Sequence, residues 1–409
     1  MDDINLIHVV PLKGVRRPNN KLLLTQKFVD GMALYRELWK GPVTLVCEPT
    51  DEASNNLDNV EVDIETAPFR TVCEDYSSVR LASLLREKAI VVVTAGEWRN
   101  GISRICKRAH VPCVYLTEQS LRTRLDIIKA DRLGVLRSVK RSLRQFAEER
   151  AQVDAIKIAD GVQCNGTPTY DAYKSLTADP LLYFDNRTDS SMLATVDQIS
   201  ARIASLRFGR PIHLAFSGRL ISIKGVNDLV DVAFWLRNFG LPFEMTICGD
   251  GDQLPVLRQK VAAAELENFV KFPGILEFKS QLLPFLKDKV DLFVCCHPQG
   301  DPSCTYVETM ACGVPIAGYA NEAFAGLVKV ADVGWTTRVN EPRELARKIT
   351  EIYGDLPRLA RASERSLEFA REHTFERTFQ QRIEHLDRIA DCVWRMSSPV
   401  DAFEFARTV

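Results

Sequence analysis

Short apolar runs alternate with longer segments of helical period along most of this 409-residue chain. In the first half, the apolar runs have the length of buried strands, and segments between them, such as 27–39, have the spacing of amphipathic helices. The predicted strands of this half are 6–10, 43–47, 90–94, 114–116, 161–164 and 181–184. Because strands and helices alternate, the pattern predicts a parallel sheet with helices on both faces.

A second series of the same kind follows a helical stretch at 196–206 and a linker at 207–211. Its predicted strands are 212–216, 243–248, 270–272, 292–296 and 315–317, and the part from 342 onward has the pattern of helices alone. A chain of 409 residues exceeds what one hydrophobic core usually organises. We therefore expect two α/β domains, which would bind ligands at the carboxyl ends of their strands, in the cleft between them.

Composition narrows the class of protein only a little. Hydrophobic residues make up 46% of the chain and charged residues 26%, as in ordinary globular proteins. The formal net charge of -1 argues against a surface that binds nucleic acid as a whole. The start of the chain is acidic, no apolar run is long enough to cross a bilayer, and the eleven cysteines are scattered. We expect a cytoplasmic protein with reduced thiols and no metal site.

The loop after the strand 212–216 carries two cations close to glycines. Gly218 allows a ligand to approach the backbone, and Arg219 and Lys224 suit a diphosphate. An exposed loop with two solvated cations explains the same residues. After the strand 243–248, Gly249 and Gly251 fit any tight strand-to-helix turn, and the sequence by itself favours that plain interpretation.

The segment 297–315 is the most informative part of the chain. It predicts a loop, a short helix that begins near Ser303, and a new strand after Gly313. The unpaired N–H groups of Ser303, Cys304 and Thr305 would form a phosphate site. Glu308, one turn further, could accept both hydroxyls of a ribose, or it could form a capping box with Thr305.

Taken together, these segments resemble glycosyltransferase family four, which consists of retaining enzymes with the GT-B fold. The resemblance covers about 212–373. The matching motifs, in chain order, are Gly218-Arg219 with Lys224-Gly225, Gly249-Asp250-Gly251, Lys271-Phe272-Pro273-Gly274, and Glu308-Thr309-Met310-Ala311-Cys312-Gly313-Val314-Pro315. The resemblance implies that Arg219 and Lys224 hold the donor diphosphate, that Glu308 binds the ribose, and that Gly218, Gly249 and Gly274 belong to the donor site.

One position departs from the family pattern. The family has two glutamates separated by seven residues, and the first would fall on Gly300. Asp301 could take over the contact with the donor sugar, or main-chain amides around Ser303–Thr305 could make it. The departure leaves the identity of the sugar open.

The resemblance also implies a division into domains and a mechanism. We expect an acceptor-binding Rossmann-like domain at 1–205, a nucleotide-sugar-binding Rossmann-like domain at 206–385, and a helical tail at 386–409 that packs back on the first domain. The protein cations would take the place of a metal, so neither metal nor cofactor is expected. The acceptor hydroxyl would attack from the face that the diphosphate leaves.

Two features of the first half bear on the acceptor. Glu118 follows the strand 112–116, where many relatives have a histidine beside the reacting sugar, so Glu118 could align the acceptor or simply cap the next helix. The segment 121–146 has the pattern of a basic amphipathic helix, which suits an anionic membrane surface and a lipid-linked acceptor. A half-buried helix with a solvated basic side is the alternative, and nucleic acid is not expected.

The sequence therefore predicts a glycosyltransferase that uses a nucleotide-diphosphate sugar in polysaccharide or glycolipid biosynthesis. Its catalytic candidates are Arg219, Lys224, Glu308, Asp301 and Glu118. Two alternatives stay open: a nucleotide-sugar epimerase on the same fold, and a non-catalytic subunit that binds nucleotide sugar within a polysaccharide assembly.

Overall fold

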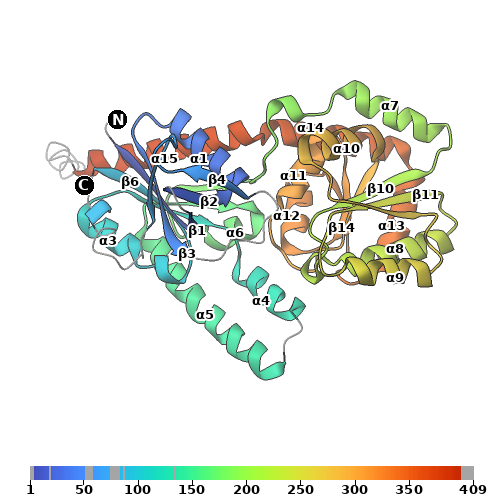
Figure 1. Ribbon diagram of the computed structural model, residues 1–409, viewed down its shortest axis with the longest axis horizontal. Coiled ribbons are helices and arrows are strands. Elements are labelled where there is room, and N and C mark those ends of the chain that lie inside the picture. Colours follow the sequence, from blue (N-terminus) through green and yellow to red (C-terminus); the bar gives the residue numbers. More distant parts are fainter. Residues whose placement is uncertain are drawn as a thin grey trace, which may run out of the picture.

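The computed structural model describes residues 4–17, 20–50, 59–73, 83–85, 88–131 and 134–397. These residues form two α/β domains that lie side by side, and a hairpin of two helices extends away from the first domain (Figure 1). Each domain is built around one sheet. The prediction of two α/β domains with parallel sheets is thus confirmed.

The sheet of the first domain has the Rossmann strand order at its centre. Its parallel part runs β5-β3-β1-β6-β7-β8-β9, so the strands leave β1 first in one direction and then in the other. The strands are β1 (Asn5–Arg17), β3 (Val43–Thr50), β5 (Arg70–Cys73), β6 (Ala89–Thr94), β7 (Cys113–Thr117), β8 (Gly161–Asn165) and β9 (Pro180–Tyr183).

An antiparallel extension of this sheet was not expected from the sequence. The pairing of β1 with β3 shifts register between Val9 and Lys13, and beyond this irregularity β1 pairs antiparallel with β2 (Lys21–Thr25). In turn β2 pairs antiparallel with β4 (Asn59–Asp63). The prediction ended the first strand at residue 10, because the continuation is polar. It contained neither β2 nor β4, and the two strands of that pair are distant in sequence.

The sheet of the second domain is parallel throughout and has the same strand order. It runs β12-β11-β10-β13-β14-β15. The strands are β10 (Ile212–Ser217), β11 (Phe243–Cys248), β12 (Val270–Gly274), β13 (Leu292–Cys295), β14 (Ile316–Tyr319) and β15 (Gly334–Thr337). Since β10 and β13 are neighbours at the centre, the loops that follow them meet at one edge of the sheet, where a ligand is expected.

Helices cover both faces of the two sheets. The helices of the first domain are α1 (Gln26–Leu38), α3 (Ile102–Ala109), α4 (Leu121–Ala130), α5 (Val135–Ile158) and α6 (Gly166–Tyr173). Of these, α4 and the first part of α5 form the hairpin that extends away from the sheet (Figure 1). In the second they are α7 (Val196–Arg207), α8 (Val226–Asn238), α9 (Leu254–Ala263), α10 (Leu283–Lys289), α11 (Cys304–Ala311), α12 (Glu322–Ala331), α13 (Pro342–Tyr353) and α14 (Leu356–Glu372). The last described helix, α15 (Phe375–Ser397), lies along the first domain (Figure 1). The expected return of the C-terminal part to the first domain is confirmed.

The hydrophobic cores suggest where the domains divide. Ile199 and Ile203 of α7 belong to the core of the second domain, and Phe379 and Ile383 of α15 belong to that of the first. We therefore propose that the chain crosses between domains at 184–195 and again at 373–374, rather than at the expected boundaries of 205 and 385. Amphipathic helices such as α7 and α15 do not reveal, from their own pattern, which core they will join.

Candidate active site

The loops after β10, β11 and β12 form a floor of bare backbone, here called the glycine floor (Gly218, Gly249 and Gly274). Gly218 N–H donates to Cys248 O at 3.1 Å, and Gly249 N–H donates to Gly274 O at 2.7 Å. The φ angle of Gly249 is +128°, and a Cβ there would overlap Gly218 O. Close backbone packing therefore requires a glycine at 249, in agreement with its interpretation as part of a tight strand-to-helix turn. The absence of a side chain also leaves a surface that a ligand can approach closely.

Two cations belong to the loop that continues from Gly218 after β10. The Arg219 side chain is exposed, and among the described residues it has no ion-pair or hydrogen-bond partner. Lys224 is mostly buried in η3 (Ser222–Lys224), and its Nζ lies 3.7 Å from Asp301 Oδ2. One free guanidinium and one loosely paired ammonium can both bind an anion such as a diphosphate.

The start of α11 offers main-chain donors at the same edge of the sheet. Ser303 is the N-cap residue, and its side chain makes no capping hydrogen bond. Thr305 lies within the helix, so the alternative of a capping box between Thr305 and Glu308 is wrong. The N–H groups of Cys304 and Thr305 are in the first turn, where partial positive charge favours an anion.

Glu308 is almost wholly buried and is paired with a residue that the sequence did not single out. Arg187 Nε donates to Glu308 Oε1 at 3.0 Å, and the Arg187 guanidinium stacks over the Phe278 ring at 3.9 Å. Arg187 belongs to the crossing segment 184–195, 121 positions from Glu308 in sequence. No local motif marks Arg187, because its role arises only when the two domains pack together.

The structure gives a steric reason for the missing first glutamate. A Cβ at Gly300 would lie 2.8 Å from Glu322 Cβ and 2.9 Å from Thr123 Oγ1, closer than side chains normally pack. The domains touch here, since Ser120 Oγ donates to Glu322 Oε2 at 2.6 Å. Asp301 lies next to this contact and accepts a hydrogen bond from Gln119 Nε2 at 3.4 Å. A carboxylate is therefore present beside Lys224, one position later than in the family pattern.

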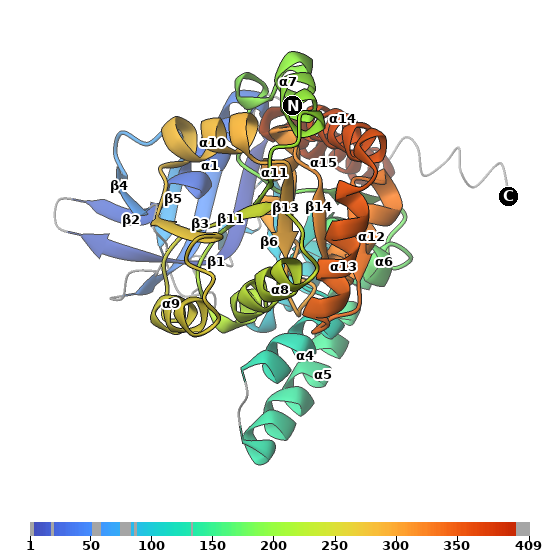
Figure 2. The ribbon, with the colours of Figure 1, turned by 90° about the vertical axis from the view of Figure 1, so that its right-hand side faces the viewer.

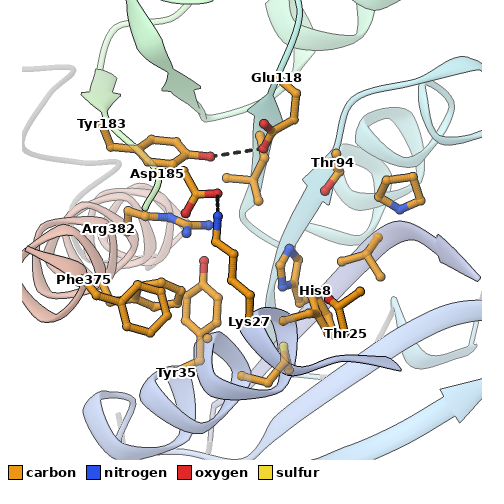
Figure 3. A pocket seen from close by; sticks show the side chains of 17 residues that line it. His8, Thr25, Lys27, Tyr35, Thr94, Glu118, Tyr183, Asp185, Phe375 and Arg382 are labelled. Carbon is orange, nitrogen blue, oxygen red and sulfur yellow. Dashed lines mark hydrogen bonds and ion pairs between the residues drawn. The ribbon is translucent and has the colours of Figure 1, made fainter. Parts of the chain in front are cut away.

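A cavity of about 290 Å³ opens in the first domain. Figure 3 shows its lining residues from close by. Its walls are largely apolar, and its labelled polar side chains point toward one another. The polar lining consists of His8, Thr25, Lys27, Tyr35, Thr94, Glu118, Tyr183, Asp185 and Arg382. Such a lining suits a ligand with an apolar face and several hydroxyl groups.

Lys27 joins this cavity to the start of α11. Lys27 Nζ lies 2.5 Å from Asp185 Oδ2 and 2.8 Å from Cys304 Sγ (Figure 3 shows the pair with Asp185). Burial by itself would lower the pKa of Lys27, but Asp185 and Cys304 outweigh it and raise the pKa above its usual value. A charged ammonium of the first domain thus stands at the N-terminal end of α11.

Glu118 lines the cavity and does not cap a helix. Ser120 caps α4, with its Oγ accepting from Thr123 N–H at 3.1 Å, so the capping alternative for Glu118 is wrong. Glu118 Oε2 accepts from Asn165 Nδ2 at 2.8 Å, and Oε1 accepts from Tyr183 OH at 3.5 Å. Burial first, and then the charge of Asp185, raises the pKa of Glu118 above its ordinary value.

Two further groups in the cavity are polar, buried and without partners. Both ring nitrogens of His8 and the hydroxyl of Tyr35 lack a hydrogen bond within the described part of the chain. Burial, followed by the charge of Arg382, lowers the pKa of His8 to about 3, so its ring is neutral. Buried polar groups in proteins are normally satisfied, and these two are free to bind hydroxyls of a ligand.

A second cavity of about 370 Å³ lies between the sheet edge and the helices α4 and α5. It shares Pro11, Thr94 and Glu118 with the first cavity, so the two meet at the end of β7. Its arginines are Arg99, Arg124 and Arg141. A ligand longer than one ring could extend from the first cavity into the second.

The basic segment 121–146 is not the single helix that the pattern predicted. It forms α4 and the first part of α5, two antiparallel helices that extend from the body of the protein (Figures 1 and 2). The break lies between Asp131, the C-cap of α4, and Gly134, the N-cap of α5. Five apolar residues in the first half of α5 are between 52% and 88% exposed: Val135, Leu136, Val139, Leu143 and Phe146. None of the helices in the described ranges is long and apolar enough to cross a membrane.

Comparison with known proteins now adds to this geometry. Residues 197–369 match the family model described as "Glycosyl transferases group 1". The chain is 32% identical over 114 residues to the 2-deoxystreptamine N-acetyl-D-glucosaminyltransferase of Streptomyces fradiae, covering 27% of this chain and 26% of that protein. It is 28% identical over 145 residues to the amylovoran biosynthesis glycosyltransferase AmsK of Erwinia amylovora, covering 34% of this chain and 35% of that protein. The match thus spans about a quarter to a third of these curated relatives.

The fold matches over nearly the whole chain. The crystal structure of Anabaena HepE in complex with UDP superposes with a TM-score of 0.66 at 17% identity, covering 93% of this chain and 98% of that one. The two facing Rossmann-like domains and the returning helix are the GT-B architecture. Residues 197–369 therefore match the glycosyl transferases of group 1, and the fold of the chain is GT-B.

Proposed function

We propose that this chain is a retaining, metal-independent glycosyltransferase of family four, which transfers a sugar from a nucleotide-diphosphate sugar to a glycan or a lipid-linked acceptor. The observation that carries the proposal is the order of the strands: the loop with Arg219 and Lys224 follows β10, and α11 follows the neighbouring strand β13, so both lie at the same edge of the sheet. These groups are the kind that bind a diphosphate without a metal. The UDP complex of HepE and the amylovoran role of AmsK support a nucleotide-sugar donor and a place in polysaccharide or glycolipid biosynthesis.

The reaction would use these groups to stabilise the leaving diphosphate. The bond between the anomeric carbon and the phosphate oxygen breaks, and its electron pair leaves with the nucleoside diphosphate. Arg219, Lys224 and the α11 amides stabilise the charge that develops there. The acceptor oxygen forms the new bond on the same face, and its proton passes to the departing phosphate oxygen. Lys27, beside Cys304, adds a cation from the opposite domain.

The first cavity suits the acceptor because it offers partners for hydroxyl groups close to the donor site. His8 and Tyr35 have unsatisfied polar atoms, and Glu118 presents a carboxylate. Burial raises the pKa of Glu118, and its carboxyl oxygens already accept hydrogen bonds from Asn165 and Tyr183, so this side chain would hold the acceptor through further hydrogen bonds. Asp301, beside Lys224, is the carboxylate best placed to touch the donor sugar.

The α4–α5 hairpin suits an anionic membrane. Its exposed apolar residues lie among exposed cations, which are Arg137, Lys140, Arg141 and Arg144. An amphipathic basic surface of this kind binds anionic headgroups and buries its apolar side chains in the lipid interface. We infer a cytoplasmic protein that docks on the inner face of the membrane, with the second cavity between the hairpin and the active site.

Vesicle sedimentation tests this docking. Wild type should pellet with vesicles that contain phosphatidylglycerol and much less with pure phosphatidylcholine. The double variant Leu136→Glu, Leu143→Glu should stay in the supernatant, while the matched control Val256→Glu, Phe208→Glu, also exposed, should pellet like wild type. Equal behaviour of the two variants would exclude the hairpin as the docking surface.

Calorimetry with a panel of nucleotide sugars, in the presence of a chelator, tests the main proposal. We expect one donor to bind at micromolar strength, and Lys224→Ala and Glu308→Ala to weaken it at least tenfold. The control Lys260→Ala removes a cation that pairs with Asp231 and should bind like wild type. If no nucleotide sugar binds, the transferase proposal fails and a structural subunit takes its place. If a donor binds and is epimerised without transfer, the epimerase alternative holds.

A further inference from the structure

The crossing segment 184–188 is extended and places alternate side chains on opposite sides. Phe184, Asn186 and Thr188 are buried, whereas Asp185 and Arg187 are partly exposed. Asn186 Nδ2 donates to His373 O at 2.8 Å, which fixes the segment on its buried side. The other side therefore faces the cleft, with Asp185 toward the first cavity (Figure 3) and Arg187 toward Glu308.

Arg187 holds one oxygen of the Glu308 carboxylate and leaves the other available. The contact joins Nε to Oε1, and no other side chain within the described ranges donates to this carboxylate. The ion pair with Arg187 compensates for the burial of the Glu308 carboxylate. Stacking on Phe278 keeps the guanidinium in one plane, so it supports Glu308 without needing to move when a ligand arrives.

We propose that Arg187 is a positioning residue that fixes the Glu308 carboxylate so that it recognises the ribose hydroxyls. The donor is then a ribonucleoside-diphosphate sugar and not a deoxyribonucleoside-diphosphate sugar. This inference rests on the proposed donor site. A carboxylate fixed in this way can accept the 2′- and 3′-hydroxyls together, and a donor without the 2′-hydroxyl loses one hydrogen bond to it. Arg187 acts through Glu308, so its loss should abolish the preference for ribose rather than binding in general.

The test compares each ribonucleoside diphosphate with its 2′-deoxy form. We would take the one among UDP, GDP and ADP that wild type binds most tightly, and measure both forms by calorimetry. Wild type should prefer the ribose form by about tenfold or more, as expected for one hydrogen bond to a charged group. Arg187→Ala should bind the ribose form about tenfold more weakly and the deoxy form almost unchanged, so that the preference disappears.

Two further variants separate positioning from other roles. Arg187→Lys keeps the charge but not the planar stack on Phe278, so it should restore only part of the preference. Arg365→Ala removes an arginine of α14 that also pairs with a carboxylate, that of Asp332, and it should leave both affinities unchanged. Urea unfolding of each variant checks that the fold is retained.

Each outcome decides the inference. Equal weakening of both forms by Arg187→Ala would mean a direct contact with the diphosphate or a purely structural role, and would overturn it. Tighter binding of the ribose form would mean that Arg187 blocks Glu308 in the free protein, and would also overturn it. If wild type binds no nucleoside diphosphate at all, the proposed function itself fails.

Discussion

The ion pair between Lys27 and Asp185 links α1 to the crossing segment, and its removal is a direct test of how the cleft is held. We would replace Lys27 by Met, which keeps the length of the side chain, and Asp185 by Asn, singly and together. The pair is short, at 2.5 Å, and each side chain is 25% exposed. In Lys27→Met, Asp185 would face Glu118 without its cation, so this variant should lose the most stability.

The structure sets the size of the expected effect. Two unit charges about 4 Å apart attract by roughly 4 kcal/mol at an effective dielectric constant of about 20. Desolvation and side-chain entropy offset part of this attraction, and exposed pairs keep only about 0.2–1 kcal/mol. For a pair that is three-quarters buried, we expect a coupling energy of about 2 kcal/mol. The Lys260–Asp231 pair, at 2.9 Å with side chains 35% and 42% exposed, should give about 0.5 kcal/mol or less.

Urea unfolding at pH 7 gives the free energy of unfolding for each member of the two double-mutant cycles. The coupling energy is the difference between the loss of unfolding free energy in the double variant and the sum of the losses in the two single variants. Adding 1 M NaCl should weaken the exposed pair more than the buried one. A coupling energy for Lys27–Asp185 as small as that of the control pair would refute the reasoning, because burial would then have added nothing.

Other predictions concern single positions of the site. Glu118→Gln should raise the free energy of unfolding at pH values above the usual pKa of glutamate, and much less at pH 4. The raised pKa of Glu118 means that the folded protein holds the proton more tightly than the unfolded chain, so the stability of wild type falls as the carboxyl ionises. Urea unfolding across pH 4–8 would measure this difference. Gly249→Ala should lower the free energy of unfolding by about 2–4 kcal/mol, because its Cβ overlaps Gly218 O at a positive φ, and denaturant midpoints would show it. Gly300→Ala should cost about 1–3 kcal/mol through its contact with Glu322, and a neutral result would contradict the packing argument.

Most of the fold could be predicted because it is encoded locally. Buried parallel strands appear as short apolar runs, and their alternation with helices specifies an α/β sheet without knowledge of any contact. The parts that were missed depend on distant partners. The pairing of β2 with β4 follows no local pattern, and the break at 131–134 depends on α4 folding back against α5 rather than continuing.

The same distinction explains which site residues were found. Arg219, Lys224 and Glu308 lie in motifs whose spacing reflects one loop or one helix, so the sequence could indicate them. Lys27 and Arg187 were missed, since Lys27 meets Asp185 across 158 positions and Arg187 meets Glu308 across 121. Ionisable residues whose partners lie in another domain carry no signal in a single sequence.

The two crossings between the domains are bonded to each other, and this limits how the cleft can open. Phe375 N–H donates to Thr188 O at 2.9 Å, and Asn186 Nδ2 donates to His373 O at 2.8 Å. Because the two crossing segments are joined at one place, they behave as a single hinge about which the domains rotate. Arg187 lies next to this hinge and would move little as the domains swing apart. The contact between Ser120 and Glu322 does not involve these segments, so it would act as a latch that separates first, and substrates would enter and leave on that side.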